Sequence, residues 1–176
     1  MKKYCAFLRG VNVNGTSMKM KEVCDVFTKA GMFGVQSILA SGNILFESDK
    51  NESDLKSILE EAMSKTFNYD AFLFIRDFKS IENVLMKKAF EDKEDCHNYV
   101  FISDKNTAEK LQQYFEEKGN KEHESAKIVD AVFYWQTPKG NTLNFEFGKV
   151  LGMKSLKDKF TSRNLNTIEK IVNKLK

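Results

Sequence analysis

The stretch VQSILASGNILFES, residues 35–48, decides the fold of the first half of this chain. It contains two extended runs separated by Gly42-Asn43, a pair typical of the tight turn between antiparallel strands. We therefore predict a β-hairpin over these residues. The segments on either side of it predict the sheet to which the hairpin belongs.

A strand and a helix precede the hairpin, and a helix and a strand follow it. Residues 3–8 (KYCAFL) are typical of a strand, and apolar residues recur at helical spacing over 20–30. After the hairpin, Asn51 or Ser53 can cap a second helix, and residues 71–76 (AFLFIR) predict a fourth strand. The order β-α-β-β-α-β is typical of a ferredoxin-like sheet, with the third strand antiparallel between the first and second.

The second half repeats part of this order, although no sequence repeat is visible. Asp77 or Ser80 opens a helix, and the acidic stretch 91–95 predicts a boundary between subdomains 1–90 and 96–176. The pattern then predicts β-α-β-β-α, with strands at 98–102, 127–135 and 141–147 and helices at 106–118 and from about Ser162. The expected fold class is α+β, with mostly antiparallel sheets covered by helices.

The predicted topology brings two polar loops together at one edge of the first sheet. The first strand ends at Arg9, and the turn at 40–43 lies beside the end of the second strand, which runs parallel to the first. Arg76 falls at the opposite edge. We therefore expect a site where the loop RGVNVNG, residues 9–15, meets the turn ASGN, residues 40–43.

The composition of these loops favours an anionic ligand. Arg9 offers a bidentate donor, glycines permit close approach of the backbone, and the loop leads into a helix N-terminus. The expected ligand-binding residues here are Arg9, Gly10, Asn12, Asn14, Gly15, Ser41, Gly42 and Asn43. The alternative is that the asparagines and Ser41 only brace two turns through local hydrogen bonds.

A second motif, TSRNLNTIEK at residues 161–170, adds three candidate residues. With Thr161 or Ser162 as the N-cap, Arg163 would lie in the first turn of a helix, where the helix dipole disfavours a cation. Either a carboxylate or a bound ligand would then compensate the charge. Asn164 and Thr167 would lie on the same side of the helix, and Arg163 could share a pocket with Arg9.

Three motifs carry a resemblance to a known family. FLRGVNVNG, ILASGNILFES and TSRNLNTIEK together resemble the domain of unknown function 1697 family (DUF1697). Asn14 stands where the family usually has Gly, and Leu165 where it often has Trp. The resemblance implies a compact α+β protein with ferredoxin-like character, and it implies no particular activity.

Several classes of function lack their residues. The Cys and His residues lack metal-ligand spacing, and GxSxG, GxxxxGK[ST] and GxGxxG are absent, so we expect no metal, no cofactor and no recognisable catalytic constellation. No apolar run approaches the roughly 20 residues that span a bilayer, and no signal peptide is visible. The three cysteines are typical of reduced thiols. We therefore expect a cytoplasmic protein.

Three functions remain open. The leading hypothesis is binding of a small anionic or nucleotide-like ligand. The second is binding of nucleic acid, because residues 148–176 contain eight basic and two acidic residues, among them Lys154, Lys157 and Lys159. No RNA-binding signature accompanies them, and a net charge of +3 is weak for that role. The third is a structural or protein-interaction module. The oligomeric state has no signal in the sequence.

Overall fold

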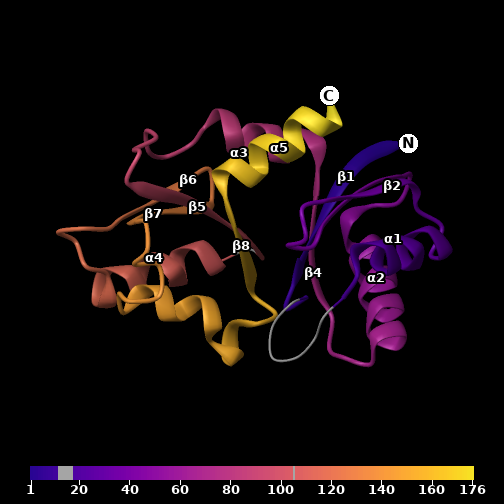
Figure 1. The fold of residues 1–176 in the computed structure, drawn as a ribbon, viewed down its shortest axis with the longest axis horizontal. Coiled ribbons are helices and arrows are strands. Elements are labelled where there is room, and N and C mark those ends of the chain that lie inside the picture. The colour runs from indigo at the N-terminus through magenta and orange to yellow at the C-terminus, as the bar shows by residue number, and fades with distance from the viewer. Residues whose placement is uncertain (12–17, 105) are drawn as a thin grey trace. The chain divides into compact units, whose positions relative to one another are not determined.

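The computed structural model describes residues 1–11, 18–104 and 106–176, and each half of the chain contributes one sheet (Figure 1). The chain divides into two compact units. Unit 1 comprises Met1–Glu82 and Lys170–Lys176, and unit 2 comprises Asn83–Glu169. Each unit has its own antiparallel four-stranded sheet and its own hydrophobic core.

Unit 1 has the predicted ferredoxin-like topology. Its strands are β1 (Lys2–Arg9), β2 (Phe33–Ile38), β3 (Asn43–Ser48) and β4 (Phe72–Asp77), in the spatial order β2-β3-β1-β4. β3 pairs with both β1 and β2 and therefore lies between them, and all neighbouring strands are antiparallel. This confirms the predicted strand order and the α+β fold class.

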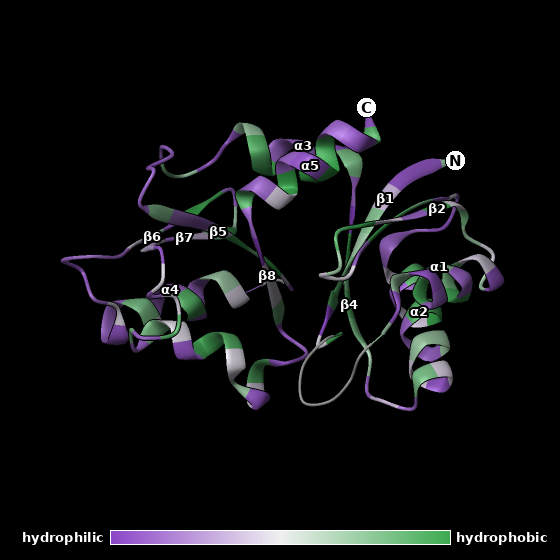
Figure 2. Ribbon diagram, in the orientation of Figure 1, coloured by the Kyte–Doolittle hydropathy of each residue, from purple (hydrophilic) through white to green (hydrophobic). Residues whose placement is uncertain are grey.

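One face of this sheet packs against α1 (Met20–Lys29) and α2 (Glu52–Phe67). Alternate residues of β1, namely Tyr4, Ala6 and Leu8, join the core with Phe27 of α1 and Leu59 of α2. Figure 2 shows apolar residues in the strands and helices that form this layer. The Asn51 side chain caps α2 by accepting a hydrogen bond from the Asp54 amide at 3.0 Å, as predicted.

Side chains of α2 occupy the outer edge of β4. The outer side of an edge strand carries backbone N–H and C=O groups that have no neighbouring strand to pair with. Here Glu60 accepts from the Leu73 amide at 2.9 Å, Lys56 donates to the Leu73 carbonyl at 2.7 Å, and Glu52 accepts from the Asp77 amide at 3.0 Å. The three α2 residues are four apart, so they lie on one face of the helix. They satisfy the backbone of an edge strand from the side.

Unit 2 has the same strand arrangement. Its strands are β5 (Cys96–Ser103), β6 (Ser125–Val129), β7 (Val132–Pro138) and β8 (Phe160–Asn164), in the order β6-β7-β5-β8. Its core packs one face of this sheet against α4 (Thr107–Lys118) and a 3₁₀ helix, η1 (Phe147–Gly152), which a second one, η2 (Lys154–Leu156), follows. α3 (Phe78–Met86) follows β4, and α5 (Leu165–Leu175) follows β8.

Two strand predictions in the second half are wrong. Residues 127–135 form not one strand but parts of β6 and β7, because Asp130 and Ala131 both adopt left-handed backbone and reverse the chain. Residues 141–147 form turns that lead into η1, and the fourth strand of the sheet is β8 instead. Neither Asp-Ala nor the segment 160–164 has a strong turn or strand signal.

The two halves repeat the same architecture, and one short stretch of sequence is similar between them. In the two sheets Arg76 pairs with Cys5 and Arg163 pairs with Val100, so the two arginines occupy equivalent positions. The ten residues that begin at each arginine, RDFKSIENVL (76–85) and RNLNTIEKIV (163–172), have Arg, Ile and Glu at the same positions. The division between the units falls after Glu82 in α3 and after the equivalent Glu169 in α5. The second half is therefore a complete counterpart of the first, with 3₁₀ helices in place of α2.

Candidate functional site

The edge of unit 1 brings together the two loops that the sequence predicts as neighbours. The Leu8 amide donates to the Gly42 carbonyl at 2.8 Å, immediately before Arg9 ends β1. Gly10 then adopts left-handed backbone, with φ of 75°. The predicted proximity of these two bends is confirmed.

Ser41 and Asn43 hold the turn in place. Asn43 is completely buried, and its Nδ2 donates to the Ile38 carbonyl at 2.9 Å and to the Ser41 hydroxyl at 3.0 Å. These are the local hydrogen bonds expected of turn-stabilising residues. The geometry therefore favours the bracing alternative for this pair over direct contact with a ligand.

Gly42 allows the turn to approach the end of β1. Its φ is 76°, and a Cβ atom at this position would lie 2.9 Å from Leu8 Cβ and 3.0 Å from a methyl group of Val11. Left-handed backbone costs a residue other than glycine about 1–3 kcal/mol. Both the backbone conformation and the available space therefore require glycine.

We expect Gly42→Ala to lower the free energy of unfolding by about 2–3 kcal/mol, because strain and overlap add. Gly31→Ala is the matched control, since Gly31 has φ of 88° but nothing within 4 Å of its Cβ position. It should lose only about 1 kcal/mol, from strain alone. Denaturant unfolding of both variants measures the difference, and equal losses would contradict the close approach.

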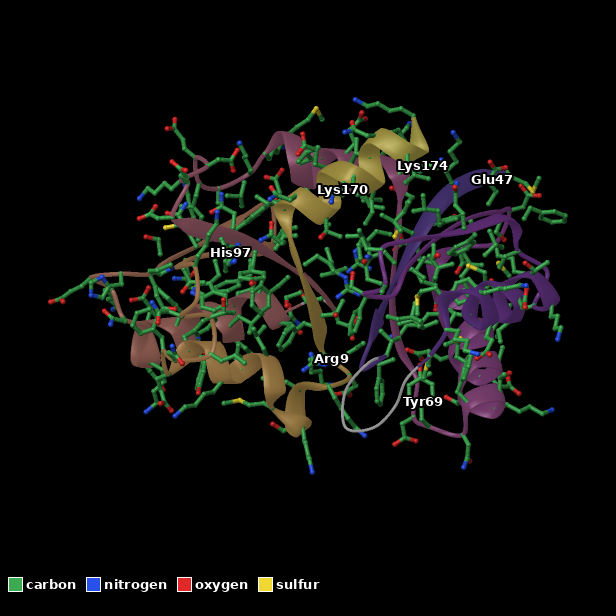
Figure 3. The ribbon with its side chains drawn as sticks, viewed as in Figure 1. Arg9, Glu47, Tyr69, His97, Lys170 and Lys174 are labelled. Carbon is green, nitrogen blue, oxygen red and sulfur yellow. The ribbon has the colours of Figure 1, made fainter. Side chains whose placement is uncertain are left out.

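The remaining residues predicted for this edge divide into two groups. Arg9 lies at the end of β1, opposite Phe72 in the strand register, and is partly buried (Figure 3). Asn12, Asn14 and Gly15 lie outside the described residues. Arg9 belongs to unit 1 and Arg163 to unit 2, so their sharing of one pocket stays a prediction.

Arg163 lies in strand β8, so its predicted place in the first turn of a helix is wrong. Pairing with β5 continues to Asn164, which delays the helix until Leu165. Arg163 is 9% exposed, and its Nη1 donates to the Thr161 hydroxyl and to the Ser162 carbonyl, both at 2.8 Å. Protein acceptors in its own strand therefore bind this guanidinium, and the expected conflict with the helix dipole does not arise.

Asn164 is the residue that caps α5. Its Oδ1 accepts from the Asn166 amide at 3.0 Å, and the other end of its amide group lies 3.1 Å from Nδ1 of His97. A backbone N–H can only donate, so the atom facing Asn166 is the oxygen and the atom facing His97 is Nδ2. Nδ1 of His97 therefore accepts a hydrogen bond, and the ring proton is on Nε2.

A cavity of about 170 Å³ opens beside this cap, within unit 2. Basic and polar side chains line it: Lys93, His97, Asn98, Lys139, Asn164 and Asn166, with Asp92 and Cys96. They come from the loop before β5, from β5 itself, from the turn after β7, from the end of β8 and from the start of α5. Figure 3 labels His97 at the start of β5. We call this space the α5 cavity.

Both positive and negative groups line the α5 cavity. Lys88 donates to Asp92 at 2.6 Å, and this hydrogen bond lowers the pKa of Asp92 more than burial raises it, so the carboxylate stays ionised. Burial, followed by the nearby charge of Asp95, raises the pKa of the Cys96 thiol, which therefore stays protonated. The two lysines, Lys93 and Lys139, provide the positive charge.

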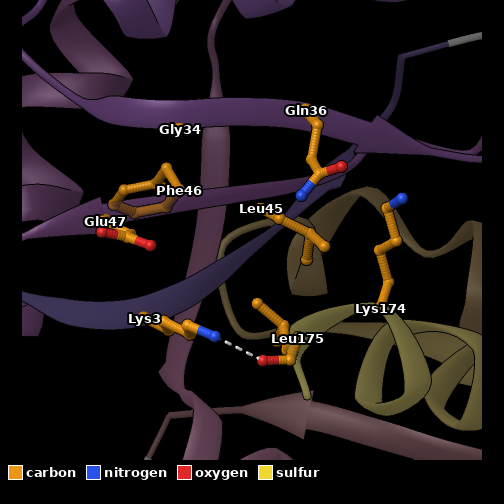
Figure 4. A pocket seen from close by; sticks show the side chains of 8 residues that line it. All are labelled: Lys3, Gly34, Gln36, Leu45, Phe46, Glu47, Lys174 and Leu175. Carbon is orange, nitrogen blue, oxygen red and sulfur yellow. Dashed lines mark hydrogen bonds between the residues drawn. The ribbon is translucent and has the colours of Figure 1, made fainter.

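A smaller cavity lies in unit 1, beside β2, β3 and the end of α5 (Figure 4). It measures about 80 Å³ and includes Gln36, Glu47 and Lys174. Lys3 also lines it, but its ammonium donates to the Leu175 carbonyl at 2.7 Å, where a cation stabilises the C-terminus of α5. It has less than half the volume of the α5 cavity, so it is the weaker candidate.

Two structural searches concern metals and membranes. In residues 1–11, 18–104 and 106–176, no three His, Cys, Asp or Glu side chains gather in a way that could hold a metal ion. No helix in these same ranges combines the length and the apolar character that crossing a bilayer requires. The three cysteines are free thiols.

Comparison with known proteins assigns the chain to a family. The model of the family described as protein of unknown function DUF1697 matches residues 1–134, about three quarters of the chain. The chain belongs to the DUF1697 family. The motif TSRNLNTIEK lies beyond the matched residues of this DUF1697 protein.

A solved structure supports the fold of this DUF1697 protein. The conserved bacterial protein SP0830 from Streptococcus pneumoniae is similar with a TM-score of 0.80 and 21% sequence identity, over 99% of this chain and 98% of that chain. Identity at this level shows the fold alone. No curated relative matches the chain.

Sequence reasoning missed most of the α5 cavity of this DUF1697 protein. Of the predicted site residues only Asn164 lines it, whereas Thr167 is a partly buried residue of α5. His97 lacks metal-ligand spacing, and Lys93 and Lys139 belong to no motif, so the sequence predicts none of the three as site residues. A signal existed: Lys139 follows the only proline, in a turn that antiparallel pairing places beside the start of β5.

Proposed function

We propose that this DUF1697 protein binds a small anion, such as phosphate or a carboxylate, in the α5 cavity. The observation that carries the proposal is the gathering of Lys93, His97 and Lys139 around one cavity. Charge-assisted hydrogen bonds, here from the two lysines, are the strong contacts by which proteins hold oxyanions.

Neutral donors supplement this charge. The backbone N–H groups in the first turn of α5 have no acceptor within the helix. The amide of Asn166 donates to Asn164 Oδ1, and the other N–H groups of this turn favour an anion. His97 keeps a proton on Nε2, because Asn164 donates to the other ring nitrogen. The protonated thiol of Cys96 adds no negative charge.

The volume of the cavity matches a small anion. About 170 Å³ is well below the roughly 300–1,000 Å³ of pockets that enclose drug-sized molecules. A phosphate or a small carboxylate fits entirely within this space, whereas a nucleotide would extend beyond it. Within the hypothesis of an anionic or nucleotide-like ligand, this favours the small anion.

The loop edge of unit 1 remains a second proposed place for such a ligand. Its support is the hydrogen bond between Leu8 and Gly42, which brings Arg9 beside the turn. Ser41 and Asn43 contribute less than expected there, because their polar groups already bind each other and the chain. Nucleic acid is less favoured, because a net charge of +3 is weak for that role.

Calorimetric titration with inorganic phosphate tests the proposal. We expect Lys139→Ala to weaken binding about tenfold or more, because a charge-assisted hydrogen bond contributes roughly 1.5–3 kcal/mol. Lys127→Ala is the matched control: it removes the same charge from an exposed position on β6 that does not line the cavity. Arg9→Ala reports separately on the loop edge.

Binding that Lys139→Ala and Lys127→Ala weaken equally would refute the α5 cavity as the site. Absence of phosphate and carboxylate binding to the unsubstituted protein would refute the proposed function. A loss confined to Arg9→Ala would move the site to the edge of unit 1.

A further inference from the structure

The α5 cavity contains a carboxylate among its cationic groups. Asp92 is the only acidic residue among the described side chains that line it. Its Oδ2 accepts from Lys88 at 2.6 Å and its Oδ1 accepts from Asn98 Nδ2 at 3.0 Å. An ionised carboxylate has about four acceptor positions, so two hydrogen bonds leave capacity for another donor.

Two other side-chain oxygens of the cavity already have donors. Asn98 Oδ1 accepts from Gln136 Nε2 at 2.8 Å, and Asn164 Oδ1 accepts from the Asn166 amide. Asp92 in contrast is 70% exposed and accessible from the cavity. A ligand that brings its own O–H group can therefore donate it to Asp92, the only carboxylate among the described residues of the lining.

A carboxylate has opposite effects on two similar oxyanions. Sulfate carries no proton, so Asp92 can only repel it. Hydrogen phosphate carries one O–H, which can donate to the carboxylate and convert repulsion into a charge-assisted hydrogen bond. At mildly alkaline pH both are dianions, so the proton and not the charge distinguishes them.

We infer that the α5 cavity selects an oxyanion that retains an O–H group, namely inorganic hydrogen phosphate, through acceptance of that proton by Asp92. This inference rests on the proposed function and names the ligand of the same site. Lys93 and Lys139 bind the anion, and Asp92 determines which anion is bound.

Titrations with sulfate, inorganic phosphate and methyl phosphate at mildly alkaline pH test this selection. The methyl phosphate dianion has no O–H, so it should bind like sulfate. We expect phosphate to bind at least about threefold more tightly than either, the range of exposed electrostatic contacts. Asp92→Asn should abolish the preference by weakening phosphate binding and strengthening sulfate binding. Glu94→Gln removes the same charge from an exposed residue outside the lining, and should preserve the preference.

The outcomes separate the two proposals. If sulfate binds as tightly as phosphate, or if Asp92→Asn leaves their ratio unchanged while Lys139→Ala still weakens both, the selection by Asp92 is refuted and the anion site stands. If none of the three anions binds to the unsubstituted protein, the proposed function itself is refuted, and the selection with it.

Discussion

Phe147→Ala is expected to lower the free energy of unfolding by about 3–5 kcal/mol, the range for loss of a buried aromatic side chain. Phe147 is completely buried in unit 2. Its ring centroid lies between 5.1 and 6.4 Å from those of five other aromatic residues: Phe101, Tyr114, Phe115, Phe133 and Trp135. These rings come from the sheet, from α4 and from η1. A cavity at this position would therefore weaken the packing of η1 against both the sheet and α4.

Denaturant unfolding, followed by the fluorescence of Trp135, measures this loss. Phe145→Ala is the matched control, because Phe145 is only partly buried and stacks on His123 alone among the described rings, at 5.9 Å. It should cost about 1 kcal/mol. A Phe147→Ala protein as stable as the Phe145→Ala protein would show that Phe147 is not the centre of this core.

Gly148→Ala is expected to cost more than about 3 kcal/mol, because the space for a methyl group is already filled by the backbone. A Cβ atom at Gly148 would overlap the carbonyl oxygen of Thr142. Backbone cannot rotate away as a side chain can, so the turn before η1 would have to move and displace the adjacent Phe147.

Gly152→Ala is the control within the same 3₁₀ helix. Nothing lies within 4 Å of its Cβ position, and its φ is not in the left-handed region, so its stability should change by no more than about 0.5 kcal/mol. Thermal unfolding of both variants gives the comparison. If Gly148→Ala were as stable as Gly152→Ala, the packing of the 142–148 turn would have to differ from that described.

The fold of the first half could be predicted from the sequence because local signals agree with the final packing. Gly42 marks the turn, Asn51 marks the start of α2, and alternate residues of β1 face the core. The order of helices and strands then leaves one common topology, which places the end of β1 beside the turn at 40–43. The hydrogen bond between Leu8 and Gly42 confirms this placement.

The second half was harder to predict because local signals there are weak or contradict the packing. Asp130-Ala131 makes a tight turn without Gly or Asn, and the apolar residues of 141–147 resemble a strand although Phe147 is buried through a 3₁₀ helix. The α5 cavity was harder still. Its residues come from three separate stretches of the chain, 92–98, 139 and 164–166, and only the pairing of β5 with β7 and β8 brings them together.

The row of α2 side chains along β4 has a consequence for behaviour at high protein concentration. A second polypeptide that approached this rim to extend the sheet would first have to displace the carboxylates of Glu52 and Glu60 from the Asp77 and Leu73 amides. Amyloid-like growth by templating is therefore disfavoured at that rim.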